Sequence, residues 1–321
     1  MQYDRLGFPI PKEFETSAVR PRATRGERAG FGFDVDGEEP AGPPRWPRYF
    51  LLFVLLFGVV PVLLVPHVLP WVRQVIVDGA VRQAIIAEGR ADVGAAARQV
   101  GRAVSWVKDA PDVQQQLLCW RSTLRLQNRD TRGAIADATA AALLVPTSSA
   151  PLRARAVAHV VAGDADAALA DAEAAVAMDG DKSPEALNHR AYIRALVGRE
   201  LPAALADIEK AMSGGGAETP EFLDTRGFIL HLLGRHHEAI DDLNRAIVGT
   251  QQTRTKVLAE VGGEGVDPAV VRWRLRPVEH ALAVIHQHRA LACRAVGLAA
   301  QAAQDFETAE RKGFAPDRGV L

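Results

Sequence analysis

The sequence predicts an all-α protein, a solenoid of helical hairpins preceded by a disordered arm and one transmembrane helix. Three observations predict this fold. Apolar residues recur at helical spacing through most of the chain after residue 73. A pattern of small, apolar and charged residues then recurs five times in the same frame. A long run without ionised side chains, residues 49–72, separates these helices from a first segment rich in Pro, Gly and charges.

The first segment, residues 1–48, is predicted to be a disordered N-terminal arm. It contains Pro, Gly and charged residues without a sustained apolar period. Stretches such as 37–44 carry too little apolar surface to offset the entropy lost on ordering. We therefore expect no packed structure in this arm.

Residues 49–72 are predicted to form a transmembrane helix. These 24 residues carry no ionised side chain, and at about 1.5 Å per residue they exceed a hydrocarbon core of about 30 Å. Trp46, Tyr49 and Trp71 lie at the ends, where aromatic rings prefer the membrane interface. A buried core helix and a signal peptide are alternatives, but the run is longer than either favours.

This segment predicts a single-pass membrane protein that contacts the lipid bilayer through residues 49–72. Arg45 and Arg48 precede the span and favour an arm held in the cytoplasm. The solenoid is then expected to be extracytoplasmic. Arg73 and Arg82 on the other flank weaken the charge asymmetry on which this orientation depends.

A helical hairpin is predicted between Glu221 and Gly249. Apolar residues recur at helical spacing on both sides of Gly234. A glycine suits the end of the first helix, because the left-handed conformation costs it little. Ala239 and Ala246 are small and share a face of the second helix, so the two helices can approach closely.

Four further stretches repeat this hairpin pattern. Each copy has an arginine in the first helix and an aspartate 16 or 17 residues later in the second: Arg121 and Asp137, Arg155 and Asp171, Arg190 and Asp207, Arg226 and Asp242, Arg289 and Asp305. The first four arginines are 34, 35 and 36 residues apart. One residue of each pair lies on each helix, so we interpret the pairs as structural ion pairs that hold the hairpins in register. A ligand site is the alternative, but a ligand would not need every copy.

These copies resemble the tetratricopeptide repeat (TPR) family, whose period is about 34 residues. The resemblance extends over about residues 114–314, although Ala or Arg often replaces the usual aromatic residues. It divides the rest of the chain into residues 73–112, a helical connector or degenerate capping repeat; 113–249, repeats one to four; 250–278, an inserted helical segment; and 279–321, the last repeat and a C-terminal tail.

The sequence indicates neither catalysis nor a cofactor. It lacks a phosphate-binding loop, zinc-spaced cysteines and the common hydrolase motifs. We therefore expect no catalytic, cofactor-binding or metal-binding residues and no small-molecule substrate. Lys and Arg total 38 and Asp and Glu total 39, so nucleic acid is not an expected partner. The scarcity of Lys beside abundant Arg, Ala and Gly points to a GC-rich bacterial genome.

The resemblance implies a scaffold or adaptor that binds another protein or peptide, because TPR proteins are generally binding modules. In TPR domains the first helix of each hairpin lines a concave groove. Candidate groove residues are therefore Arg153, Asn188, Tyr192, Asp224, Phe228, His231, Gln287 and Arg294. Tyr192 and Phe228 offer the area typical of binding hot spots, unless both rings pack against neighbouring hairpins.

Two other functions remain open at this point. The chain is alternatively an architectural subunit of a membrane complex. It is alternatively an enzyme whose site lies on the inserted segment, where Arg272, Arg274 and Arg276 cluster.

Overall fold

The computed structural model describes residues 2–3, 9–10, 60–180, 183–213, 218–263 and 265–314, with side chains in the helical region from Val68 onward. The chain divides into two compact units, residues 1–75 and 76–321. In the first unit, the short strand β1 (Gln2–Tyr3) pairs antiparallel with β2 (Pro9–Ile10). The remainder of the predicted arm, and residues 49–59 of the predicted transmembrane helix, lie outside the described residues.

The prediction of a single-pass membrane protein is wrong. In the part of the chain that the structure describes, no helix is long and apolar enough to cross a membrane. The helix α2 (Val60–Gly89) does not end with the apolar run but continues through Arg73, Asp78 and Arg82. Its later part is amphipathic, since Ala84 is buried and Arg82 is exposed. The predicted contact with a bilayer is not supported, and the predicted orientation with an extracytoplasmic solenoid loses the membrane span on which it depended.

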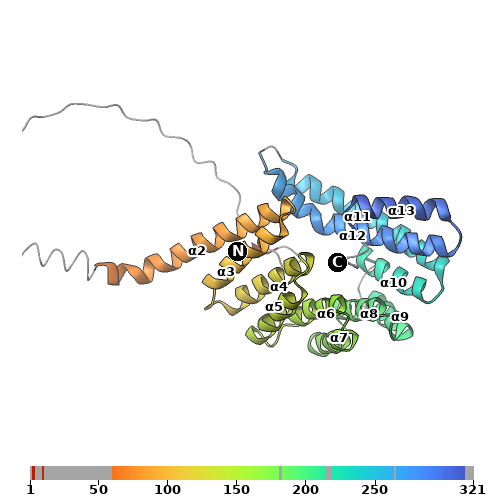
Figure 1. Ribbon diagram of the computed structural model, residues 1–321, viewed down its shortest axis with the longest axis horizontal. Coiled ribbons are helices and arrows are strands. Elements are labelled where there is room, and N and C mark those ends of the chain that lie inside the picture. The colour runs from red at the N-terminus through yellow and green to blue at the C-terminus, as the bar shows by residue number, and fades with distance from the viewer. Residues whose placement is uncertain are drawn as a thin grey trace, which may run out of the picture. The chain divides into compact units, whose positions relative to one another are not determined.

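The second unit is an all-α solenoid of helical hairpins, in which each helix from α3 onward packs on the next (Figure 1). After α2 come α3 (Val93–Trp106), α4 (Pro111–Gln127), α5 (Thr131–Leu144), α6 (Ala150–Ala162), α7 (Ala165–Asp179), α8 (Pro184–Leu196), α9 (Leu201–Ser213), α10 (Pro220–Leu232), α11 (His236–Val261), α12 (Pro268–Ala295) and α13 (Ala299–Arg311). The even-numbered helices open the hairpins and the odd-numbered helices close them.

Local sequence explains where the helices begin and turn. Asp92, Asp130 and Asp164 cap α3, α5 and α7 by accepting a hydrogen bond from a first-turn backbone N–H. Proline in the first turn begins α4, α6, α8, α10 and α12, where its missing N–H costs nothing. Gly234 has a φ of 82°, as its position at the end of the first helix predicts.

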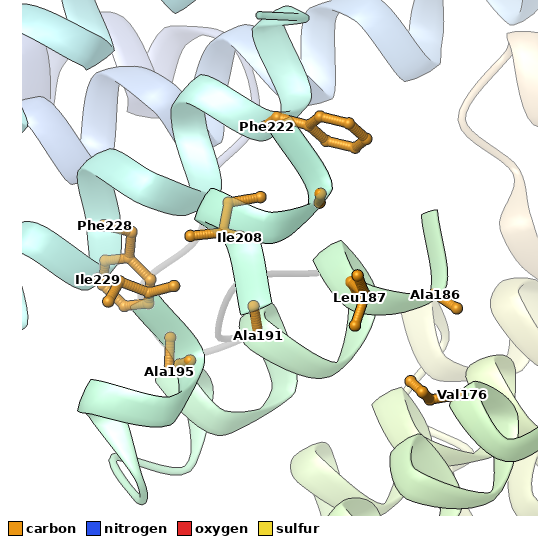
Figure 2. Packing of buried hydrophobic residues seen from close by; sticks show 11 residues of the cluster. Val176, Ala186, Leu187, Ala191, Ala195, Ile208, Phe222, Phe228 and Ile229 are labelled. Carbon is orange, nitrogen blue, oxygen red and sulfur yellow. The ribbon is translucent and has the colours of Figure 1, made fainter. Parts of the chain in front are cut away.

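Small residues on the closing helices allow close packing inside each hairpin. Ala239 and Ala246 of α11 are fully buried. A Cβ atom added at Gly227 of α10 would lie 2.7 Å from Leu243 Cγ, so this crossing requires glycine. Larger side chains fill the space between hairpins: Leu187 of α8, Ile208 of α9 and Ile229 of α10 belong to one buried cluster (Figure 2).

The predicted inserted segment belongs to two long helices. α11 has 26 residues and α12 has 28, and Pro277 lies inside α12 rather than ending it. The N-terminal part of α12 packs against the end of α2. Arg272 Nε donates a hydrogen bond to the Gly89 carbonyl oxygen at 2.7 Å, and Arg276 Nη1 donates to Glu88 Oε1 at 2.7 Å. We call this the α2–α12 contact.

Candidate functional site

The five arginines of the repeat pattern contact their predicted aspartates. In each pair the arginine Nε and Nη2 atoms donate to the two carboxylate oxygens, at 2.6–2.8 Å. The aspartates are buried: Asp137, Asp171, Asp207, Asp242 and Asp305 are 2–8% exposed. A guanidinium and a carboxylate joined by two hydrogen bonds form a directional pair. Each pair therefore links the two helices of one hairpin at a fixed register.

Three of these five arginines also donate a hydrogen bond to the preceding hairpin, which sequence reasoning missed. Arg155 Nη1 donates to Thr139 Oγ1 at 3.2 Å, and Arg190 Nη1 donates to Glu173 Oε2 at 2.7 Å. Likewise, Arg289 Nη1 donates to Asn244 Oδ1 at 2.6 Å. Each acceptor stands two residues after the repeat aspartate of the earlier hairpin, a fixed offset that the sequence contains.

The aspartates raise the pKa of three of these arginines, Arg155, Arg190 and Arg226. The hydrogen bond with Asp207 is the main reason that the pKa of Arg190 lies above its usual range. Asp171 and Asp242 raise the pKa of Arg155 and of Arg226 in the same way. The repeated Arg–Asp pairs therefore hold the hairpins together and do not form a ligand site.

A cavity of about 360 Å³ lies where the opening helices converge. Its walls come from five helices: Arg153 of α6; Glu185, Asn188, His189 and Tyr192 of α8; Glu221, Asp224 and Thr225 of α10; Thr250 of α11; Ala281 and Ile285 of α12. We call it the first-helix pocket. Four of the candidate groove residues line it, namely Arg153, Asn188, Tyr192 and Asp224.

The other four candidate residues are not among its lining. Phe228 is only 9% exposed and stacks on His288, with ring centroids 4.0 Å apart. Its ring therefore packs in the core, the alternative that the sequence left open. His231 contacts His236 through their Nδ1 atoms at 3.1 Å. Arg294 lies over the Phe306 ring at 5.4 Å, and Gln287 is half-buried on α12.

The first-helix pocket carries more negative than positive charge. Three carboxylates line it, those of Glu185, Glu221 and Asp224, against one guanidinium, that of Arg153. Arg153 Nη1 is 3.0 Å from the Asp179 carboxylate, so its charge is already paired. Burial, with a smaller effect of the Arg153 charge, lowers the pKa of His189 to about 4. His189 is therefore neutral at pH 7.

Two polar atoms at the pocket have no hydrogen-bond partner within the described residues. They are Asn188 Oδ1 and His189 Nε2, both of which are inaccessible to solvent. Burial, followed by the charge of Asp224, raises the pKa of Tyr192 well above its usual value. Buried polar groups normally have partners, so these two atoms are unsatisfied hydrogen-bonding groups in residues of the pocket wall.

Among the residues that the structure describes, no group of three or more His, Cys, Asp or Glu side chains could hold a metal ion. Cys119 and Cys293 are free thiols, and burial raises the pKa of Cys119 to about 11. Arg272 and Arg276 of the inserted segment, considered as part of an enzyme site, are engaged in the α2–α12 contact.

These hairpins, with their repeated Arg–Asp pairs, define a helical-repeat protein of the TPR-like kind. No protein-family model matches the sequence, and no curated protein matches it. Solved structures that resemble it include a tetratricopeptide repeat protein from Parabacteroides merdae, 15% identical, with a TM-score of 0.43 over 74% of this chain and 94% of that one. A TPR protein from Thermus thermophilus is 18% identical, with a TM-score of 0.46 over 54% and 91%. PilW, a type IV pilus biogenesis factor, is 15% identical, with a TM-score of 0.39 over 60% and 90%.

Proposed function

We propose that this protein is a scaffold that binds a segment of another protein in the first-helix pocket. The observation that carries the proposal is the convergence of four opening helices on one cavity whose polar atoms are incompletely paired. A volume of about 360 Å³ lies at the lower end of the range of roughly 300–1,000 Å³ for ligand sites. It accommodates one or two side chains of a partner rather than a folded domain.

Tyr192 is the proposed anchor of the interaction. Its ring lines the pocket and is 6.4 Å from the buried Phe228 ring, so the core supports it from behind. Tyrosine combines a large rigid apolar area with a polar end, and it is enriched among residues that dominate binding energy. Asn188 lies one helical turn before Tyr192 on α8 and adds a polar contact.

A photo-cross-linking amino acid at two positions tests the proposal. Glu185 is an exposed residue at the pocket, and Ala206 is an exposed residue on the closing helix α9. Irradiated in cells, the protein with the cross-linker at Glu185 should form a discrete covalent product with a second protein, and the Ala206 version should not. Adding Tyr192→Ala should remove the Glu185 product. Equal products from both positions, or a product indifferent to Tyr192→Ala, would place binding elsewhere.

A further inference from the structure

We infer that the first-helix pocket receives a basic side chain, arginine or lysine, from the partner segment. The inference rests on the proposed function and adds the chemistry of the group that is bound. Its first support is charge. Glu185, Glu221 and Asp224 line the cavity, although Asp224 Oδ1 also lies 2.8 Å from His288 Nδ1. The single guanidinium among the lining residues is paired with Asp179. A cation entering the pocket gains attraction, whereas a peptide carboxylate meets repulsion.

The second support is the direction of the hydrogen bonds. Thr225 Oγ1 donates to the Glu221 carbonyl oxygen at 3.0 Å, and Thr250 Oγ1 donates to the Ala246 carbonyl oxygen at 2.8 Å. Each hydroxyl has thereby used its only hydrogen, so its oxygen can only accept a further hydrogen bond. Asn188 Oδ1 is also an acceptor without a partner among the described residues.

The carboxylates, the two threonine oxygens and Asn188 Oδ1 give the lining several acceptors beside the donors of Asn188, His189 and Tyr192, and a ligand rich in donors can pair these acceptors. Guanidinium and ammonium groups donate hydrogen bonds and accept none. Neutral amides and hydroxyl groups do both, so they would match this lining less completely. Because several acceptors are buried, an unpaired one has a cost that a donor-rich ligand removes.

The third support is the apolar part of the lining. Ile285 and Ala281 of α12 and the ring of Tyr192 stand beside the polar groups. Long basic side chains bury their aliphatic stems along apolar surface while the charged head finds polar partners. A cation near the face of an aromatic ring gains further attraction. The pocket therefore has apolar surface for the aliphatic stem of an arginine or lysine side chain and polar groups for its charged head.

Selection of random peptides displayed on phage against the full-length chain tests the inference. Recovered peptides are synthesised, and their dissociation constants are measured by fluorescence anisotropy at low and high salt. We expect a basic residue at one recurrent position. Replacing it by norleucine should weaken binding roughly tenfold, as should the double change Glu185→Gln, Glu221→Gln, because two partly exposed charge contacts are lost. Higher salt should weaken peptide binding to the wild type more than peptide binding to this double variant.

Two exposed carboxylates outside the pocket provide the matched control. Glu307→Gln, Glu310→Gln on α13 removes the same charge from exposed positions and should leave the dissociation constant unchanged. Glu185 and Glu221 are themselves exposed, so the pocket variant should keep the wild-type circular dichroism and melting temperature.

The outcomes separate the two proposals. One outcome would overturn this inference and leave the scaffold function standing. In that outcome Tyr192→Ala weakens binding of the selected peptides, but the peptides share no basic position and bind the Glu185→Gln, Glu221→Gln variant as tightly as the wild type. Selected peptides that are acidic would also overturn this inference and leave the scaffold function standing. Failure to select any peptide, or binding that Tyr192→Ala does not weaken, would overturn the scaffold function at this pocket and the inference with it.

Discussion

Arg226 and Asp242 join the two helices of one hairpin through two hydrogen bonds, Nε to Oδ2 at 2.6 Å and Nη2 to Oδ1 at 2.7 Å. Asp242 is 5% exposed. Its replacement leaves a guanidinium facing a buried site, so Asp242→Ala should lower the free energy of unfolding by about 3–5 kcal/mol. Arg226→Ala and the double variant complete a double-mutant cycle. Urea denaturation of the four proteins should give a coupling energy of about 1–3 kcal/mol between the two side chains.

The same hairpin contains the control for this cycle. Arg235 and Glu238 are also joined by two hydrogen bonds, but both side chains are exposed. Solvent screens exposed pairs, so their cycle should give a coupling energy within the error of the measurement. If the Arg226–Asp242 cycle gave the same result, these pairs would not hold the hairpins in register.

Phe228 and Tyr192 should respond differently to truncation. Phe228 is buried against His288, so Phe228→Ala leaves a cavity and should lower the free energy of unfolding by about 3–5 kcal/mol. Tyr192 is half-buried at the pocket, so Tyr192→Ala should lower the free energy of unfolding clearly less than Phe228→Ala does. Tyr192→Ala should nevertheless weaken binding of a selected peptide. Urea denaturation and peptide anisotropy on both variants check this. Equal losses of stability would make Tyr192 a core residue.

His189 should make stability depend on pH in the acid range. Burial lowers the pKa of its imidazole to about 4 in the folded chain, against about 6.5 in the unfolded chain. Between these values the unfolded state binds a proton that the folded state does not, so stability falls as the pH falls through this window. The free energy of unfolding should be lower by on the order of 3 kcal/mol when the pH reaches 4.

Substitution isolates this contribution. His189→Gln cannot take up a proton, so urea midpoints measured between pH 7 and pH 4 should fall less steeply than in the wild type. His237→Gln, at an exposed position, is the matched control and should follow the wild-type curve. Parallel curves for wild type and His189→Gln would show that the buried imidazole contributes nothing.

Arg276 should hold the N-terminal part of α12 in place. It donates to Glu88 at 2.7 Å and to Gln127 Oε1 at 2.5 Å, and Glu88 also accepts from Trp120 Nε1 at 3.0 Å. Burial already raises the pKa of Glu88, against the opposing charge and hydrogen bond of Arg276. Arg276→Ala should therefore lower the free energy of unfolding by about 1.5–3 kcal/mol, the value of a hydrogen bond to a charged group.

Hydrogen exchange locates this effect. Amides near the end of α2 and the start of α12 should exchange faster in Arg276→Ala, while those of α8 and α9 should keep their wild-type rates. Arg274→Ala is the control, because Arg274 faces Glu260 across the α11–α12 hairpin at 3.9 Å. Uniformly faster exchange in all helices would mean that Arg276 acts on the whole fold.

The sequence predicts the hairpins and the partners of the repeat arginines because both depend on short separations. A spacing of 16 or 17 residues places the two charges on facing helices of one hairpin, whatever surrounds them. The placement of Phe228 depends on distant sequence. Helical spacing assigns the ring to a face of α10, but the residue that covers it, His288, belongs to α12.

The predicted transmembrane helix failed for a related physical reason. The prediction rests on the length and lack of charge of residues 49–72, and it ends the segment at Val72. In the described residues the helix continues to Gly89. Its later part packs in the protein through buried side chains, those of Val77, Ala80 and Ala84. The sequence predicted four of the residues that line the pocket but not the cavity itself, because its lining comes from residues as distant as Arg153 and Ile285.

The α2–α12 contact has a consequence for how the chain folds. Where hairpins touch only their neighbours, a solenoid behaves as a one-dimensional array, and its terminal repeats open first. Here Arg272 and Gly89, 183 residues apart, are joined directly, so the opening of either end breaks contacts made by the other. Such a distant contact forms late, because the loop between its partners must be closed first. The hairpins should consequently assemble quickly and locally, and the last step should convert an array of semi-independent repeats into one cooperative unit.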